Sequence, residues 1–117
     1  MNNSDLKKRT QKFAFRVIRL VESLPKGRTA DIIGRQLLRC GTSVGANYRS
    51  ACRAKSRRDF ISKMGIVEEE SDESIYWMEI IVQAGLLPAK RISDLMKEAE
   101  EILAITVSSI KTARKNK

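Results

Sequence analysis

Apolar side chains recur at every third or fourth position along most of the chain. This spacing is seen near the N-terminus at Phe13, Val17, Leu20, Val21 and Leu24, and near the C-terminus at Ile92, Leu95, Met96, Ala99, Ile102, Leu103, Thr106 and Ile110. It is the period of an α-helix that buries one face, and no segment shows the alternation that is typical of a β-strand. The pattern therefore predicts an all-α protein.

Three short segments interrupt this pattern. Two contain the prolines of the chain, LPKGRT at 24–29 and AGLLP at 84–88, and proline ends helices because it lacks an N–H donor. The third lies at Ser56, because Ser56 and Asp59 have the spacing of a capping box. The predicted helices span residues 5–24, 29–54, 56–85 and 89–113. Their short connections favour a single up-down antiparallel four-helix bundle over residues 1–117.

The segment CGTSVGANYRSACRAKSRRDF, residues 40–60, resembles a loop in composition but has the periodicity of a helix. At about 100° per residue, the basic and apolar positions of the predicted helix 29–54 separate onto different faces. One face is basic and polar: Arg35, Arg39, Thr42, Ala46, Arg49 and Arg53. The opposite face is apolar and is predicted to enter the core: Ile33, Leu37, Val44, Tyr48 and Ala51.

Three glycines, Gly34, Gly41 and Gly45, share a third stripe of this helix. Each glycine inside a helix costs about 0.5–1 kcal/mol relative to alanine, so a compensating contact is expected. Small residues on one line allow another backbone to approach closely. That backbone belongs either to a neighbouring helix of the same bundle or to a second subunit, and the sequence leaves both alternatives open.

The charge of the chain is strongly basic and unevenly distributed. There are 23 Lys and Arg residues against 14 Asp and Glu, a net charge of +9, which makes nucleic acid the first partner to consider. The candidate phosphate-binding track follows the basic face into the next helix: Arg35, Arg39, Arg49, Arg53, Lys55, Arg57 and Arg58. Such contacts read little sequence. We expect the backbone of structured RNA or of a duplex as ligand, because aromatic residues are few and most have core spacing.

The acidic segment IVEEESDESIYWMEI, residues 66–80, offers a competing interpretation. Glu70 and Glu73 flank Trp77, which lies outside the main apolar stripe and indicates either a second contact surface or a wide buried face. If these acids pair with Arg35, Arg39 or Arg49, the basic residues serve helix or subunit pairing. The protein would then be a structural oligomer or adaptor with a protein partner.

Several function classes are disfavoured. The chain has no histidine, which removes the commonest general base and the Glu-x-x-His ligands of di-metal bundles. We therefore expect no enzyme, no metal and no cofactor. No apolar run approaches the roughly 18 residues of a membrane span, and the N-terminus does not resemble a signal peptide, so a cytoplasmic location is expected. Cys40 and Cys52 are too far apart on one helix to form a disulfide and are expected to be buried apolar side chains.

The run RQLLRCGTSVGANYRSACRAKSRRDFISKMGIVEEESDESIYW, residues 35–77, carries a family resemblance. With its glycines, Asn47, the Ser56 cap, Lys63 and Trp77, it resembles the four-helix bundle proteins encoded by intervening sequences of bacterial 23S ribosomal RNA genes. More remotely, the chain is similar to the accessory protein of diversity-generating retroelements. The resemblance implies an up-down bundle, a homopentameric ring and no established enzymatic activity. For the retroelement relatives it also implies nucleic-acid binding and a reverse transcriptase partner.

Overall fold

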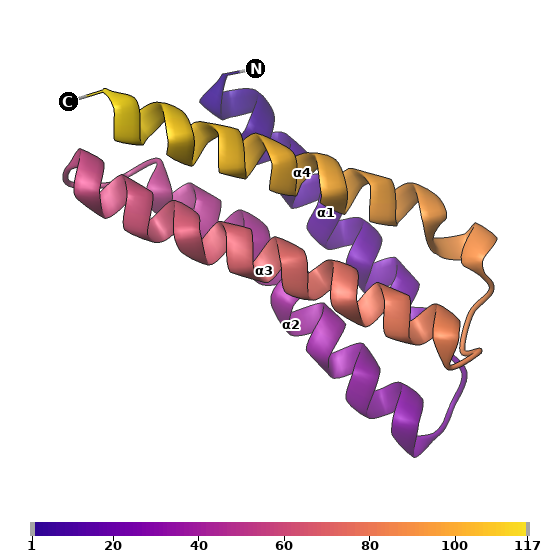
Figure 1. The fold of residues 1–117 in the computed structure, drawn as a ribbon. Helices are drawn as coiled ribbons and strands as arrows, with labels where there is room; N and C mark the ends of the chain where they lie inside the picture. Colours follow the sequence, from indigo (N-terminus) through magenta and orange to yellow (C-terminus); the bar gives the residue numbers. More distant parts are fainter. Residues whose placement is uncertain (1, 117) are drawn as a thin grey trace.

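The computed structural model describes residues 2–116 as four antiparallel helices that run up and down along one long axis (Figure 1). The helices are α1 (Asn3–Glu22), α2 (Arg28–Ala51), α3 (Arg57–Gln83) and α4 (Ala89–Lys115). The bundle measures 50 × 21 × 20 Å, and both ends of the chain lie at the same end of it. The predicted all-α four-helix bundle is confirmed, and every predicted helix boundary lies within three residues of the observed one.

The start of α3 shows how side chains set the helix ends. The Ser56 hydroxyl accepts a hydrogen bond from the Asp59 N–H at 3.0 Å, as the capping box predicts. The Asp59 carboxylate, however, accepts from the N–H of Lys55 at 3.0 Å and not from that of Ser56. The helix therefore begins at Arg57, one residue later than predicted, and Ser56 is its cap.

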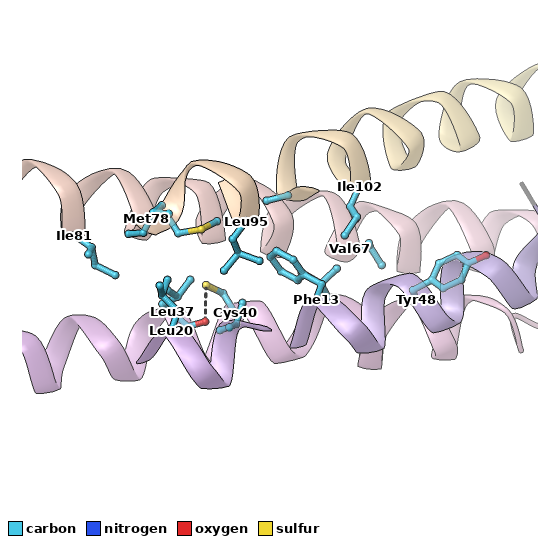
Figure 2. Packing of buried hydrophobic residues seen from close by; sticks show 14 of the residues in the cluster. Phe13, Leu20, Leu37, Cys40, Tyr48, Val67, Met78, Ile81, Leu95 and Ile102 are labelled. Carbon is cyan, nitrogen blue, oxygen red and sulfur yellow. Dashed lines mark hydrogen bonds between the residues drawn. The ribbon is translucent and has the colours of Figure 1, made fainter. Parts of the chain in front are cut away.

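The core runs along the whole bundle axis and is built from one face of each helix (Figure 2). Every apolar position predicted for α2 is buried: Ile33, Leu37, Val44, Tyr48 and Ala51. On α3, a helical wheel from Phe60 predicts Val82 as the last core position, and this is wrong, because Ile81 is fully buried and Val82 only half-buried. The buried positions of α3 are alternately three and four residues apart, so the buried position after Met78 is residue 81. Cys40 is buried as expected, whereas Cys52 is only half-buried, and both are free thiols.

The glycine stripe of α2 lies against α1 of the same chain. A Cβ atom added at Gly41 would lie 2.8 Å from both methyl carbons of Val17, and one added at Gly45 would lie 3.3 Å from the backbone carbonyl carbon of Thr10. Gly34 faces Leu24 in the same way, at 3.0 Å. Real Cβ atoms essentially never lie as close as the 2.8 Å at Gly41, and the distances at Gly34 and Gly45 are tighter than most Cβ contacts, so the glycines allow α1 and α2 to pack at short distance.

The contact between α1 and α4 closes the bundle and is the least extensive of the helix contacts. Arg9 on α1 binds Glu98 on α4 through two hydrogen bonds, of 2.7 and 2.8 Å, and its Nη2 also binds Glu101 at 2.6 Å. A bidentate Arg–carboxylate pair of this kind fixes orientation as well as distance. Arg9 thus sets the register of α1 on α4. Among the described residues, no helix is long and apolar enough to cross a membrane.

Candidate nucleic-acid interface

A groove of about 350 Å³ lies between the N-terminal half of α1 and the C-terminal half of α2. We call it the α1–α2 groove. Its charged side chains are Lys7 and Lys8 from α1, Arg49 from α2 and Arg53 from the turn that follows α2, and no acidic side chain lines it. None of these four cations forms an ion pair with a carboxylate in residues 2–116. The groove is therefore a concentrated and uncompensated positive site.

The sequence builds this groove from small residues flanked by long basic ones. Gly45 lets α1 approach α2 closely, and Ala46 and Ala14 leave the floor shallow and free of bulky side chains. Arg49 lies in the last turn of α2 and Arg53 just beyond the C-cap Cys52, and both side chains line the groove. The result is a groove whose lining combines small and uncharged polar residues with four cations.

The arginines predicted to form one track do not share one environment. Arg49 and Arg53 line the α1–α2 groove, but Arg35 lies at the other end of α2, in a second groove that also contains Glu22 and Asp31. Arg39 leans toward α3. At about 100° per residue, Arg39 and Arg49 lie on opposite sides of the line on which they were grouped. One therefore reaches α3 and the other α1.

The acids of α3 bind the arginine that faces them. The Arg39 guanidinium forms ion pairs with Glu70, at 3.4 Å, and with Glu73. Glu73 also accepts a hydrogen bond from the Trp77 indole N–H at 3.0 Å, and the half-buried Trp77 ring packs edge to face against Tyr76 at 5.0 Å. Within residues 2–116 no group of three or more Cys, Asp and Glu side chains could hold a metal ion.

The remaining predicted cations, Lys55, Arg57 and Arg58, are exposed around the turn between α2 and α3. This turn lies at the same end of the bundle as the two chain termini (Figure 1). The hydrogen bond from the Lys55 N–H, followed by that from the Lys63 ammonium, lowers the pKa of Asp59, which stays ionised beside these cations. The three residues extend the positive surface around the end of the bundle.

A second basic groove was not anticipated from the sequence. It has a volume of about 300 Å³ and lies between the C-terminal half of α1 and the start of α4. We call it the α1–α4 groove. Its charged lining consists of Arg16, Arg19, Lys90, Arg91 and Asp94. The sequence contained a signal for this groove. Lys90 and Arg91 occupy the first turn of α4, which has no acidic residue. The helix dipole disfavours cations at this position, so the stability of the helix does not account for them.

Lys7 is the other cation that the sequence analysis missed. On a helical wheel of α1, Lys8 shares one face with Lys12, Arg16 and Arg19, and Lys7 lies outside that face. Lys7 lines the α1–α2 groove because of how α1 packs against α2, and a helical wheel of α1 alone does not show that packing.

Comparison with known proteins is consistent with this architecture. A solved structure described as a protein of unknown function from the S23 ribosomal protein family of Bacteroides thetaiotaomicron is 32% identical, with a TM-score of 0.88. The match covers 95% of this chain and 99% of that one. No curated protein sequence matches the chain. The family model of the 23S rRNA-intervening sequence protein matches residues 2–108, and neither description names a catalytic activity. The chain therefore belongs to the 23S rRNA-intervening sequence protein family.

Proposed function

We propose that this protein binds nucleic acid through the α1–α2 groove, by contacts to the phosphate backbone that carry little sequence specificity and involve no catalysis. The observation that supports this most directly is the convergence of Lys7, Lys8, Arg49 and Arg53 on one groove without an acid among its lining residues. Cations of this kind neutralise phosphates and release bound counterions, which supplies most of the free energy of non-specific binding.

The chemistry of the groove fits a phosphodiester backbone better than a small anion. Its two arginines can each present two parallel N–H donors to a phosphate, whereas the two lysines act as mobile point charges. The cations come from two helices and line an open groove, so they can follow successive phosphates. The family name refers to ribosomal RNA, which supports structured RNA as the first ligand to test.

A second candidate function is a structural homo-oligomer or adaptor that binds a protein. The observation that favours it is the exposed apolar surface of α3, where Ile66 and Tyr76 are 41% and 52% exposed next to a run of acids. The homopentameric ring that the resemblance implies would use such a surface. A protein-binding function does not require the cations of the α1–α2 groove, so an experiment on these cations can separate the two candidates.

The test is fluorescence anisotropy of a labelled RNA hairpin and a labelled DNA duplex with nuclease-stripped protein at several salt concentrations. We expect binding near physiological salt, with log K falling linearly against log salt at a slope of about −0.9 per phosphate neutralised on the duplex. The double substitution Arg49→Glu with Arg53→Glu should weaken binding by more than tenfold.

The matched control places the same change of charge at the opposite end of the bundle. Lys26→Glu with Arg28→Glu alters exposed residues next to the turn between α1 and α2. This control should lose much less affinity than the groove variant. Equal losses would refute the groove as the interface, and an absence of binding at near-physiological salt would favour the protein-binding candidate.

A further inference from the structure

Phe15 is an exposed aromatic residue on the outward face of α1. Its side chain is 57% exposed, whereas Phe13, two residues earlier, is 1% exposed and lies in the core. Two residues correspond to about 200° of helical rotation, so the two rings point in nearly opposite directions. Phe15 thus does not contribute to the core of the bundle.

The neighbours of Phe15 along the outward face are cations. Lys12 precedes it by three residues and Arg19 follows it by four, and both are exposed, so each lies within one helical turn of the ring. Neither forms an ion pair with a carboxylate in the described part of the chain. The Glu98 carboxylate, whose pKa is lowered mainly by its hydrogen bonds from Arg9 and least by the charge of Lys12, is bound by Arg9.

Phe15 also lies between the two basic grooves. Lys8 lines the α1–α2 groove and Arg19 lines the α1–α4 groove, and Phe15 falls between them on α1. Arg19 follows Lys8 by eleven positions, which correspond to about 16 Å along the helix axis. At about 3.4 Å per stacked nucleotide, this corresponds to about five nucleotides of one strand.

We propose that an unpaired base stacks on Phe15 while the phosphates of its strand follow the cations of α1 from one groove to the other. This inference rests on the proposed function and specifies its ligand as single-stranded nucleic acid, such as the loop of a structured RNA. Every base has a π-face, so stacking on an exposed aromatic ring is tolerant of sequence. Bases within a duplex are stacked on each other and cannot reach the ring.

Charge favours nucleic acid over the same face of a second copy of this chain as the occupant here. A symmetric contact through the same face would bring Lys12 and Arg19 of one copy against the identical cations of the other. A strand of nucleic acid instead supplies the opposite charge to the cations and an aromatic surface to the ring. The sequence-based expectation of duplex or structured backbone assumed that most aromatic residues have core spacing, and Phe15 does not.

The test compares three probes of equal length: a single-stranded RNA, the same strand annealed to its complement, and a strand with abasic sites. Phe15→Ala should weaken binding of the single strand by about 5- to 100-fold, with the slope of log K against log salt unchanged. Binding of the duplex and of the abasic strand should not change. Phe15→Trp should retain the affinity for the single strand, because it keeps a stacking surface.

A second readout and a control make the result specific. A 2-aminopurine base in the single strand should lose fluorescence on binding to the unmodified protein and not to Phe15→Ala. The control, Ile32→Ala, removes another exposed apolar side chain, 55% exposed on α2, and should leave affinity within twofold. Sedimentation velocity of each variant monitors the oligomeric state.

If Phe15→Ala and the unmodified protein bind each of the three probes with the same affinity, the stacking proposal is overturned. The groove proposal is then decided by the variant that carries Arg49→Glu with Arg53→Glu. A change in oligomeric state for Phe15→Ala, without loss of base-dependent binding, would also overturn it and assign Phe15 to a subunit contact. Failure of the unmodified protein to bind any of the probes would overturn both proposals.

Discussion

The guanidinium of Arg9 and the carboxylate of Glu98 form a bidentate ion pair that joins the first helix to the last. Nε lies 2.7 Å from Oε2 and Nη2 lies 2.8 Å from Oε1. The two side chains are only 24% and 17% exposed, so solvent screens this pair less than a fully exposed one. Because α1 and α4 have the least extensive contact of any adjacent helices, the pair carries a large share of bundle closure.

Replacement of Arg9 should therefore lower the stability of the whole fold. We expect Arg9→Met to reduce the free energy of unfolding by about 1–2 kcal/mol, since it leaves the partly buried Glu98 carboxylate without its donor. Urea denaturation followed by circular dichroism measures the change. Lys111→Met is the control, because Lys111 is exposed and has no ion pair in residues 2–116; a loss of equal size there would contradict the prediction.

The same ion pair should make stability depend on pH. The hydrogen bonds from Arg9 lower the pKa of Glu98 in the folded protein, whereas an unfolded Glu has a pKa of about 4.3. The unfolded chain takes up the proton first as pH falls, so the stabilisation is complete above about pH 5 and is lost progressively as the pH falls through the folded pKa of Glu98.

Glu98→Gln isolates this effect. The difference in the free energy of unfolding between the unmodified protein and Glu98→Gln should be largest at neutral pH. It should shrink as the pH is lowered through the folded pKa of Glu98. Glu100→Gln, at an exposed position of the same helix, should show no such dependence. A difference that stays constant from pH 7 to pH 3 would be evidence against the ion pair.

Two glycines should respond in opposite ways to alanine. A Cβ at Gly41 would lie 2.8 Å from the methyl carbons of the fully buried Val17. Overpacking of this kind costs about 1–3 kcal/mol, so Gly41→Ala should destabilise the protein despite the better helix propensity of alanine. Gly65 has no atom within 4 Å of its added Cβ, and Gly65→Ala should stabilise by about 0.5–1 kcal/mol.

A compensating substitution checks the cause. Val17→Ala removes the methyl groups that an alanine at Gly41 would meet, so the double variant should be more stable than the sum of the two single changes predicts. Additive losses in chemical denaturation would show that the contact with Val17 is not the reason.

Arg39 should contribute little to nucleic-acid binding, although it lies on the same helix as Arg49. Its charge is already opposed by Glu70 and Glu73. We expect Arg39→Ala to leave the affinity for RNA within twofold, while Arg49→Ala lowers it and reduces the salt slope by about one phosphate. Equal losses of affinity for the two single variants would contradict this division.

Much of the fold was accessible from the sequence because helix periodicity is a local property. The α2 core positions, from Ile33 to Ala51, follow directly from it, and the Ser56 cap follows from side-chain spacing. The site depends on contacts between helices. Whether Arg39 faces acids or phosphate depends on the position of α3, and whether Lys7 lines a groove depends on how closely α1 approaches Gly45. Phe15 is an intermediate case. A helical wheel shows that it points away from Phe13, but its position between two basic grooves is visible only in the structure.

Because both termini lie at the same end of the bundle, their position determines where a reporter can be attached without blocking the ligand. Both ends of the chain emerge at the end of the bundle that carries Lys55, Arg57 and Arg58 (Figure 1). A reporter fused there competes sterically and electrostatically with any ligand of the α1–α2 groove. A fluorophore on the turn between α1 and α2, or on the turn between α3 and α4, sits at the far end of a molecule 50 Å long. Those turns leave the α1–α2 groove open, whereas the turn between α3 and α4 adjoins Lys90 and Arg91 of the α1–α4 groove.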